Sequence, residues 1–349
     1  MRIAGIATVL PEHVYSQQDI TEALRRYWGE RLERPGLLEK LHARVGVAQR
    51  HLAFPFERYR QFKTWGETNK AWFEVGEELG TRAIDAALER AGLARNEIDA
   101  LYIVSITGVA SPSLDARLIN RMNLRRDLKR TPVFGLGCVG GAVGLTRAAD
   151  YVLAYPDQVA VLLSVELCSL TMLKDDLSTV NLIATGLFAD GAVAAVVAGS
   201  KQPCAGPEIL SQRSIFYPGT EDIMGWDISE RGFAVVLSKK LPALIKCHLG
   251  ADVDSFLAGN GLTRRDIGSW LIHPGGPKVL QAVEDALGLQ RCELRRSWEN
   301  LKWTGNLSSG SVLAVLGEAM NNHRPAAGTI GLIAAMGPGF CSELILIRW

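Results

Sequence analysis

The chain has 349 residues, which is enough for two or three ordinary domains or for one large duplicated core. Hydrophobic residues make up 48% and charged residues 21%, and these globular proportions exclude disordered, collagen-like and coiled-coil proteins. The 38 Lys and Arg residues nearly balance the 37 Asp and Glu residues, so the net charge offers no general attraction to nucleic acid or to acidic lipid.

The chain begins with a short apolar run that ends at Pro11, which is too short for a secretory signal or a membrane-spanning helix. The six cysteines are scattered and form no Cys-x-x-Cys pair, so their spacing predicts neither a disulfide framework nor a zinc site. We therefore expect a protein of the reducing cytoplasm, with no membrane span and no metal.

Apolar strands and helical segments alternate through the first half of the chain. Residues 77–91 and 141–154 place apolar side chains at three- and four-residue steps, which predicts buried helices. Apolar runs that predict strands occur at 101–107, 131–137, 159–166 and 192–199. This alternation is typical of a layered α/β protein.

The second half of the chain repeats this pattern. The segment GLARNEIDALYIVS (92–105) matches GLTRRDIGSWLIHP (261–274), and the same offset pairs the glycine-rich residues 135–145 with 304–316. Such self-similarity predicts two copies of one structural unit. The alternative is that any two strand–turn–helix units look alike at this level of detail.

Cys138 follows a predicted strand in GLGCVGG (135–141), where glycines open the next helix. A thiol at a helix N-terminus is close to unpaired backbone N–H groups and to the positive end of the helix dipole, which favours the thiolate. The small neighbours also leave room for an acyl group. An isolated cysteine is more often a buried structural residue, but two possible partners favour a nucleophile here.

These partners, His273 and Asn306, lie at unusual turns in the second half. His273 ends the run SWLIH and precedes the turn PGGP (274–277), so its ring is expected to project into a site. There it could pair with the thiolate and donate a hydrogen bond to a carbonyl group. Asn306 in TGNLSS (304–309) stands where a helix N-cap is expected, but its amide could also stabilise an oxyanion. A structural histidine and a helix cap are the alternatives.

Cys, His and Asn also serve papain-like proteases, in which water completes the reaction. That hypothesis predicts a cleft open to water. The duplicated α/β pattern, with the nucleophile buried after a mid-chain strand, favours transfer of the acyl group to a second carbon substrate.

At these residues the sequence resembles the type III polyketide synthases, the chalcone synthase-like branch of the thiolase superfamily. The similarity covers nearly the whole chain and is carried by GLGCVGGAVGL (135–145), LIHPGGPKVL (271–280), WTGNLSSGSVL (303–313) and AMGPGFCSE (335–343). It implies a homodimer whose subunit has a five-layered αβαβα core made of two duplicated halves. We place the half with the nucleophilic cysteine at 1–203 and the half with His and Asn at 204–349.

The resemblance implies an acyltransferase. Cys138 would carry the acyl chain, while His273 and Asn306 would orient the thioester carbonyl and stabilise the enolate that forms as malonyl-CoA loses carbon dioxide. Decarboxylation needs no general base, but its carbanion needs hydrogen-bond donors, which these two side chains supply. Acyl-CoA and malonyl-CoA enter as substrates, an acyl carrier protein is an alternative donor, and no separate cofactor is implied.

Within the family, SVELCSLT (164–171) is more similar to bacterial alkylpyrone and alkylresorcinol synthases than to plant chalcone synthases. This implies a long-chain fatty acyl starter and an alkylpyrone or alkylresorcinol product. Five residues match substrate-binding positions: Phe188 as a gatekeeper, Thr107 and Cys168 along an acyl tunnel, Val235 in place of a second gatekeeper Phe, and Lys40 near the CoA phosphates. Arg44 and Arg50 lie near Lys40 but out of register, and a core aromatic is the alternative role of Phe188.

Three other hypotheses remain. A chain-initiating ketoacyl synthase of fatty-acid biosynthesis shares Cys, His and Asn but condenses once on acyl carrier protein, and the HPGGP turn favours the polyketide branch. A thiolase would need a second catalytic cysteine near the end, and the surroundings of Cys341 do not resemble that motif. A catalytically silent partner that only binds an acyl ligand is the third.

Overall fold

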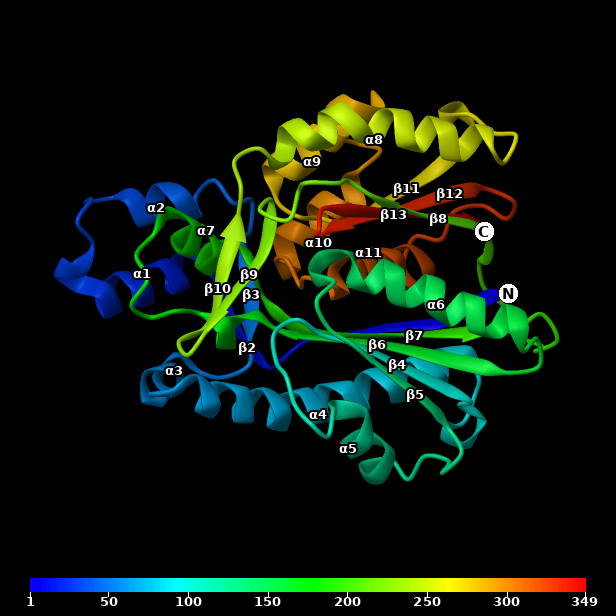
Figure 1. The fold of residues 1–349 in the computed structure, drawn as a ribbon, viewed down its shortest axis with the longest axis horizontal. Helices are drawn as coiled ribbons and strands as arrows, with labels where there is room; N and C mark the ends of the chain where they lie inside the picture. The colour runs from blue at the N-terminus through cyan, green and yellow to red at the C-terminus, as the bar shows by residue number, and fades with distance from the viewer.

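The computed structural model describes all 349 residues and arranges its helices and strands in five layers (Figure 1). Nine strands are hydrogen-bonded in the order β11-β12-β13-β8-β1-β7-β6-β4-β5. A single pair of the ladder, Arg2 with Glu208, joins β1 to β8, so the sheet divides there into two parts. The first part contains β1 (Arg2–Val9), β7 (Asp190–Ala198), β6 (Val159–Leu167), β4 (Ala100–Val104) and β5 (Lys129–Val133). The second part contains β8 (Glu208–Phe216), β13 (Cys341–Arg348), β12 (Ile330–Gly337) and β11 (Ile267–Ile272).

Helices form the other three layers, as Figure 1 shows. The outer face of the first part is covered by α4 (Trp65–Ala91) and α5 (Leu114–Arg121). The middle layer consists of α6 (Gly140–Ala154) and α11 (Gly310–Asn321), with α10 (Arg295–Thr304) packed beside α11. The outer face of the second part is covered by α8 (Leu241–Ala258) and α9 (Pro277–Leu287). The expected αβαβα core is therefore confirmed.

The two parts of the sheet have the same topology, which confirms the duplication. In the first part β4 pairs parallel with β6, β6 antiparallel with β7, and β7 antiparallel with β1. In the second part β11 pairs parallel with β12, β12 antiparallel with β13, and β13 antiparallel with β8. Gly92 and Gly261, which begin the matching segments, both have a left-handed backbone with φ near +70°. The edge strand β5 has no counterpart in the second part.

Burial of both sheet faces explains why two central strands are continuously apolar. Every residue of β6 and of β7 is buried, so these strands lack the alternation of a half-exposed sheet. Three core clusters of 30, 30 and 26 buried residues fill the space between the five layers. The first of these occupies the middle layer and draws residues from both halves of the chain.

The remaining elements form a lateral region beside the layers (Figure 1). They are the helices α1 (Gln17–Trp28), α2 (Leu37–His42), α3 (Phe56–Gln61) and α7 (Thr179–Leu187), and the two-stranded ribbons β2 (His13–Ser16) with β3 (Gln49–Leu52) and β9 (Met224–Ser229) with β10 (Gly232–Leu237). None of the helices has both the length and the apolar character that crossing a membrane would require.

Candidate active site

Close packing around Cys138 explains the glycines that flank it. Cys138 lies in the short 3-10 turn Gly137–Val139, directly before α6. Gly137 has a positive φ of 50°, and a Cβ atom there would lie 2.7 Å from the ring of Pro338. A Cβ atom at Gly141 would lie 2.0 Å from the carbonyl oxygen of Ser309. Glycine at these positions lets α6 approach the start of α11 and the loop after β12.

A chain of contacts joins the three candidate catalytic residues. The thiol of Cys138 donates to Ser308 Oγ at 3.9 Å, and the backbone N–H of Ser308 donates to Asn306 Oδ1 at 2.8 Å. Asn306 Nδ2 donates to the carbonyl oxygen of Gly275 at 3.4 Å. Gly275 in turn packs against His273, because a Cβ atom there would lie 3.4 Å from the ring atom Cδ2. The structure therefore brings Cys138, His273 and Asn306 into one neighbourhood.

Asn306 does not cap α11, which was the structural alternative for this residue. The helix begins at Gly310, and Ser309 occupies the cap position. The backbone of Asn306 is instead held by the segment around Phe188, because its N–H donates to Leu187 at 3.0 Å and its carbonyl accepts from Ala189 at 2.9 Å. This double attachment fixes the position of the amide side chain.

Burial dominates the electrostatics of the site. The exposed fraction is 7% for Cys138, 2% for His273 and 1% for Asn306. Burial raises the pKa of Cys138 to about 12 and lowers the pKa of His273 to about 4. Thiol and imidazole are therefore both neutral at pH 7, and burial outweighs the effect of the helix terminus. Both ring nitrogens of His273 are buried and have no hydrogen-bond partner within the protein.

A buried carboxyl group lies next to this centre. Glu166, near the end of β6, accepts hydrogen bonds from the backbone N–H of Ile106 at 3.1 Å, from Thr107 Oγ1 at 2.9 Å and from the hydroxyl of Ser309. Burial raises the pKa of Glu166 to about 7, against the effect of these hydrogen bonds. Its negative charge also contributes to the raised pKa of Cys138. The protonation of Glu166 therefore changes near neutral pH, beside the nucleophile.

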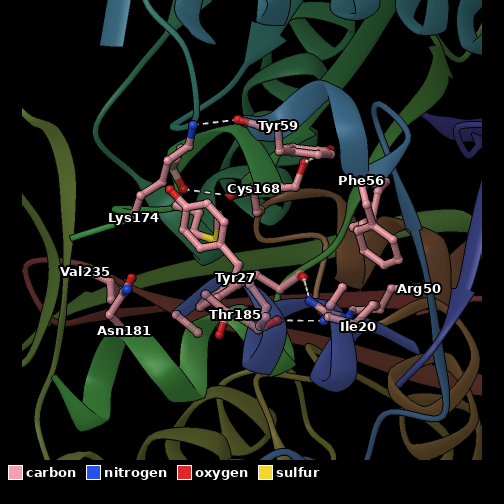
Figure 2. Close-up of a pocket in the computed structure, with 18 of the residues that line it drawn as sticks. Ile20, Tyr27, Arg50, Phe56, Tyr59, Cys168, Lys174, Asn181, Thr185 and Val235 are labelled. Carbon is pink, nitrogen blue, oxygen red and sulfur yellow. Dashed lines mark hydrogen bonds between the residues drawn. The ribbon is translucent and has the colours of Figure 1, made fainter. Parts of the chain in front are cut away.

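A mostly apolar cavity adjoins the site between α1, α3, α7 and the β9–β10 ribbon (Figure 2). Fourteen of its 21 lining residues are hydrophobic. Phe188, Cys168 and Val235, which the sequence predicts to bind substrate, lie in its wall. Phe188 also pairs with Asn306 in a β-bridge, so the cavity wall and the catalytic neighbourhood share one piece of backbone.

The other two predicted substrate-binding residues lie outside this wall. The hydroxyl of Thr107 accepts from Trp72 Nε1 at 3.1 Å and from the backbone N–H of Leu167 at 3.0 Å, and it donates to Glu166. Lys40 is exposed on α2. Contact of Thr107 with an acyl chain, and of Lys40 with CoA phosphates, stay predictions.

Comparison with known proteins identifies the family of the chain. Residues 11–205 match the family model of FAE1/Type III polyketide synthase-like proteins, and residues 208–349 match the C-terminal domain of chalcone and stilbene synthases. The chain belongs to the type III polyketide synthases. Members of this family use CoA thioesters and catalyse decarboxylative Claisen condensation, so the protein is an acyltransferase.

Three related type III polyketide synthases show the extent of the similarity. The chain is 50% identical to 1,3,6,8-tetrahydroxynaphthalene synthase of Streptomyces peucetius subsp. caesius, over 99% of this chain and 93% of that enzyme. It is 34% identical to a putative chalcone synthase of Bacillus subtilis (strain 168), over 99% and 98% of the two chains. The solved structure of 1,3,6,8-tetrahydroxynaphthalene synthase from Streptomyces coelicolor A3(2) superposes with a TM-score of 0.94 at 30% identity, covering 100% of this chain and 99% of that one.

Arg50 is a residue of this polyketide synthase whose place the sequence did not predict. It lies in β3, is 3% exposed, and donates to the carbonyl oxygens of Phe188 at 2.5 Å and Thr185 at 2.6 Å. Burial lowers the pKa of Arg50 to about 10, while the charge of Asp190 acts in the opposite direction. Its stem packs on Gly305, where a Cβ atom would lie 3.0 Å from Arg50 Cγ. An arginine in a four-residue strand gives no sequence signal of such burial.

Proposed function

We propose that this type III polyketide synthase carries its growing chain on Cys138 and extends it with malonyl-CoA. The thiol of Cys138 attacks the starter thioester while its proton passes to the neutral imidazole of His273, and the imidazolium then gives this proton to the CoA sulfur as the bond between the acyl carbon and CoA breaks. Malonyl-CoA then loses carbon dioxide, and donors on His273 and Asn306 stabilise the enolate oxygen. The enolate carbon attacks the acyl thioester, and the Cys138 sulfur leaves. The contact chain from Cys138 through Asn306 to the His273 loop is the observation that supports this proposal.

For the starter, we propose malonyl-CoA itself, with a product of the tetrahydroxynaphthalene type. The relative with 50% identity is named for that product. Oxygen atoms at the 1, 3, 6 and 8 positions of a naphthalene are the pattern left by two-carbon units joined head to tail. Such a product needs no starter other than the extender.

A long-chain fatty acyl starter, leading to an alkylpyrone or alkylresorcinol, is the second candidate. The apolar cavity supports it, because Cys168 lies in a wall where most side chains are hydrophobic. Each buried CH₂ group of a fatty starter contributes about 0.8 kcal/mol to binding. A starter arriving on acyl carrier protein would reach the same thiol.

Product masses distinguish these proposals. The purified enzyme is incubated with malonyl-CoA alone, and in parallel with malonyl-CoA and a series of acyl-CoAs from acetyl to long-chain. Products built only from two-carbon units support the malonyl starter, and products that retain a long alkyl chain support the second candidate. No polyketide in either incubation would contradict both.

We further propose that the enzyme is a cytoplasmic homodimer. Phe134 directly follows the edge strand β5 and is 46% exposed, beside a surface groove lined by Val109, Ala110 and Pro132. A partner subunit would cover such apolar surface. Light scattering on the protein as it elutes from a size-exclusion column measures the mass of the particle in solution. A mass equal to that of one chain would contradict the proposal.

A further inference from the structure

Arg50 binds the C-terminal end of helix α7. A helix leaves its last carbonyl oxygens without partners inside the helix, and a positive charge is favourable at that end. Arg50 Nη2 donates to the carbonyl oxygen of Thr185 at 2.6 Å (Figure 2), and Nη1 donates to that of Phe188 at 2.5 Å. The carbonyl oxygen of Gly186 accepts from Gln17 Nε2 at 2.9 Å. The pKa of Arg50, about 10, leaves the guanidinium charged at pH 7, so a buried cation fixes the end of α7.

The same end of α7 holds the backbone of Asn306. The backbone N–H of Asn306 donates to the carbonyl oxygen of Leu187 at 3.0 Å, and its carbonyl oxygen accepts from the N–H of Ala189 at 2.9 Å. These two hydrogen bonds lie on either side of Phe188, whose own carbonyl group is bound by Arg50. A movement of this segment would therefore carry Asn306 with it.

Arg50 also packs directly on the residue before Asn306. Gly305 has a positive φ of 77°, and a Cβ atom there would lie 3.0 Å from Arg50 Cγ and 3.1 Å from Arg50 Cδ. On its other side the same atom would lie 2.9 Å from the Cβ atom of Ala189. Arg50 thus supports Asn306 twice, through the end of α7 and through Gly305.

Arg50 is itself held rigidly. It lies in β3 and is 3% exposed, and the residue before this strand, Ala48, donates its N–H to the carbonyl oxygen of Lys302 in the last turn of α10 at 2.7 Å. The carboxyl group of Asp190 supplies the opposing charge and accepts from the backbone N–H of Ala53, just after β3, at 2.6 Å. A guanidinium is planar, so its donors keep a fixed geometry. These contacts make Arg50 a firm support for the segments around it.

We propose that Arg50 is a positioning residue for the decarboxylation of malonyl-CoA, because it fixes the end of α7 and Gly305 and so sets the place of the Asn306 amide. This inference rests on the proposed function, in which that amide stabilises the enolate. Arg50 touches no reacting atom in this role and acts through Asn306. A displacement of about 1 Å in a catalytic group can cost up to about a hundredfold in rate. Decarboxylation therefore depends on Arg50 only while residue 306 keeps its amide.

The test is a double-mutant cycle in which release of carbon dioxide from malonyl-CoA is measured. Arg50→Met keeps an apolar stem and removes the donors, and it should lower the rate about tenfold. In the Asn306→Ala background the same substitution should change the rate by less than about twofold, because the amide that it would displace is absent. Arg50→Lys keeps the charge but cannot bind both carbonyl groups in the same geometry, so its loss should be intermediate.

Arg264→Met is the matched control. Arg264 also donates from both terminal nitrogens to backbone carbonyl oxygens, those of Ala286 at 3.2 Å and Gly250 at 2.9 Å, but it does so at the outer helices α9 and α8. This variant should release carbon dioxide at the wild-type rate. Equal losses in Arg264→Met and Arg50→Met would assign the effect to stability and overturn the proposal. An equal effect of Arg50→Met with and without the Asn306 amide would overturn it too.

Circular dichroism shows which variants are folded under the conditions of the assay. If Arg50→Met is not folded, Arg50→Lys takes its place in the cycle, and an equal effect in both backgrounds again overturns the proposal. A wild-type enzyme that releases no carbon dioxide from malonyl-CoA, or an Asn306→Ala variant that releases it normally, would instead refute the proposed function, and this inference with it.

Discussion

Cys138 and His273 are both buried away from water, and each is most stable there without charge. The raised pKa of Cys138 and the lowered pKa of His273 mean that a thiolate–imidazolium pair forms only by transfer of a proton between two buried groups. Such a pair would be stabilised by the substrate carbonyl that it meets, because charges interact strongly where water is excluded.

Separate substitutions should divide the reaction into its two chemical parts. Cys138→Ala should abolish acylation and chain extension but leave part of the malonyl-CoA decarboxylation, because the donors on His273 and Asn306 act without the thiol. Asn306→Ala should lower decarboxylation about a hundredfold, as loss of one oxyanion donor does elsewhere. Mass spectrometry measures acylation, and release of carbon dioxide measures decarboxylation. Normal decarboxylation by Asn306→Ala would leave the residue a purely structural role.

Glu166 should make stability depend on pH in a way that a variant can isolate. Its pKa is raised to about 7 in the folded protein, so the folded state binds a proton more readily than the unfolded chain between pH 4.5 and 7. This contribution to the free energy of unfolding is present below pH 4.5 and is lost as pH rises through 7, by about 3 kcal/mol. Glu166→Gln should lack it.

Urea unfolding of wild type and Glu166→Gln at pH 5 and pH 8 measures this difference. Other buried groups, among them Asp190 and His42, titrate in both proteins and cancel in the comparison. The free energy of unfolding of wild type, relative to that of Glu166→Gln, should be greater at pH 5 than at pH 8. A gap that is the same at both pH values would show that Glu166 keeps an ordinary pKa.

At the scale of elements, the approach of α6 to α11 shapes the site. The N-terminal turns of these two helices meet in the middle layer, where Gly141 lies against the backbone of Ser309. The same turns carry Cys138 and the Asn306–Ser309 segment. A change that separates the helices therefore moves the nucleophile away from its partners.

Gly141→Ala should test this contact. Its Cβ atom would overlap the carbonyl oxygen of Ser309, and because a backbone atom cannot rotate aside, we expect a loss of about 1–3 kcal/mol in the free energy of unfolding together with loss of condensation. Gly66→Ala in α4 is the control, since its Cβ atom would meet only Thr64 Oγ1 at 3.8 Å. Urea denaturation measures both. Equal stability of the two variants would contradict the role assigned to Gly141.

The sequence predicted those elements whose burial follows from the pattern of a few consecutive residues. Continuous apolar runs revealed β6 and β7, and the glycines and turns that fix Cys138, His273 and Asn306 are local features. Arg50 could not be found in this way, because its burial depends on contacts with α7 and with Phe188. The β9–β10 ribbon was not predicted either, since only Gly232 and Phe233 of its residues are buried.

At the scale of the whole molecule, neither half is complete without the other. The central core cluster of 30 buried residues contains α6 from the first half and α11 from the second. Residues 1–203 alone would expose one apolar face of their sheet to water. We therefore expect this fragment to be insoluble or to lack fixed packing, with ANS binding and no near-ultraviolet circular dichroism.

Expression of residues 1–203 and 204–349 as separate chains checks this expectation. Together they should form a complex that regains near-ultraviolet circular dichroism and malonyl-CoA decarboxylation. Cooperative unfolding of 1–203 on its own would show that this half folds without the helices of the second half. The two halves would then be independent domains.

The matching topology of the two sheet parts relates the start of α6 to the start of α11 by an approximate twofold axis. An exact axis would place the same group at both helix ends. Claisen condensation joins an electrophilic acyl group to a nucleophilic carbon, and two identical helix ends could not treat these reactants differently. Cys138 at one end and the Asn306–Ser309 segment at the other break this symmetry where the two reactants meet. Only the site needs to be asymmetric, so the scaffold around it can keep the plan of two equal halves.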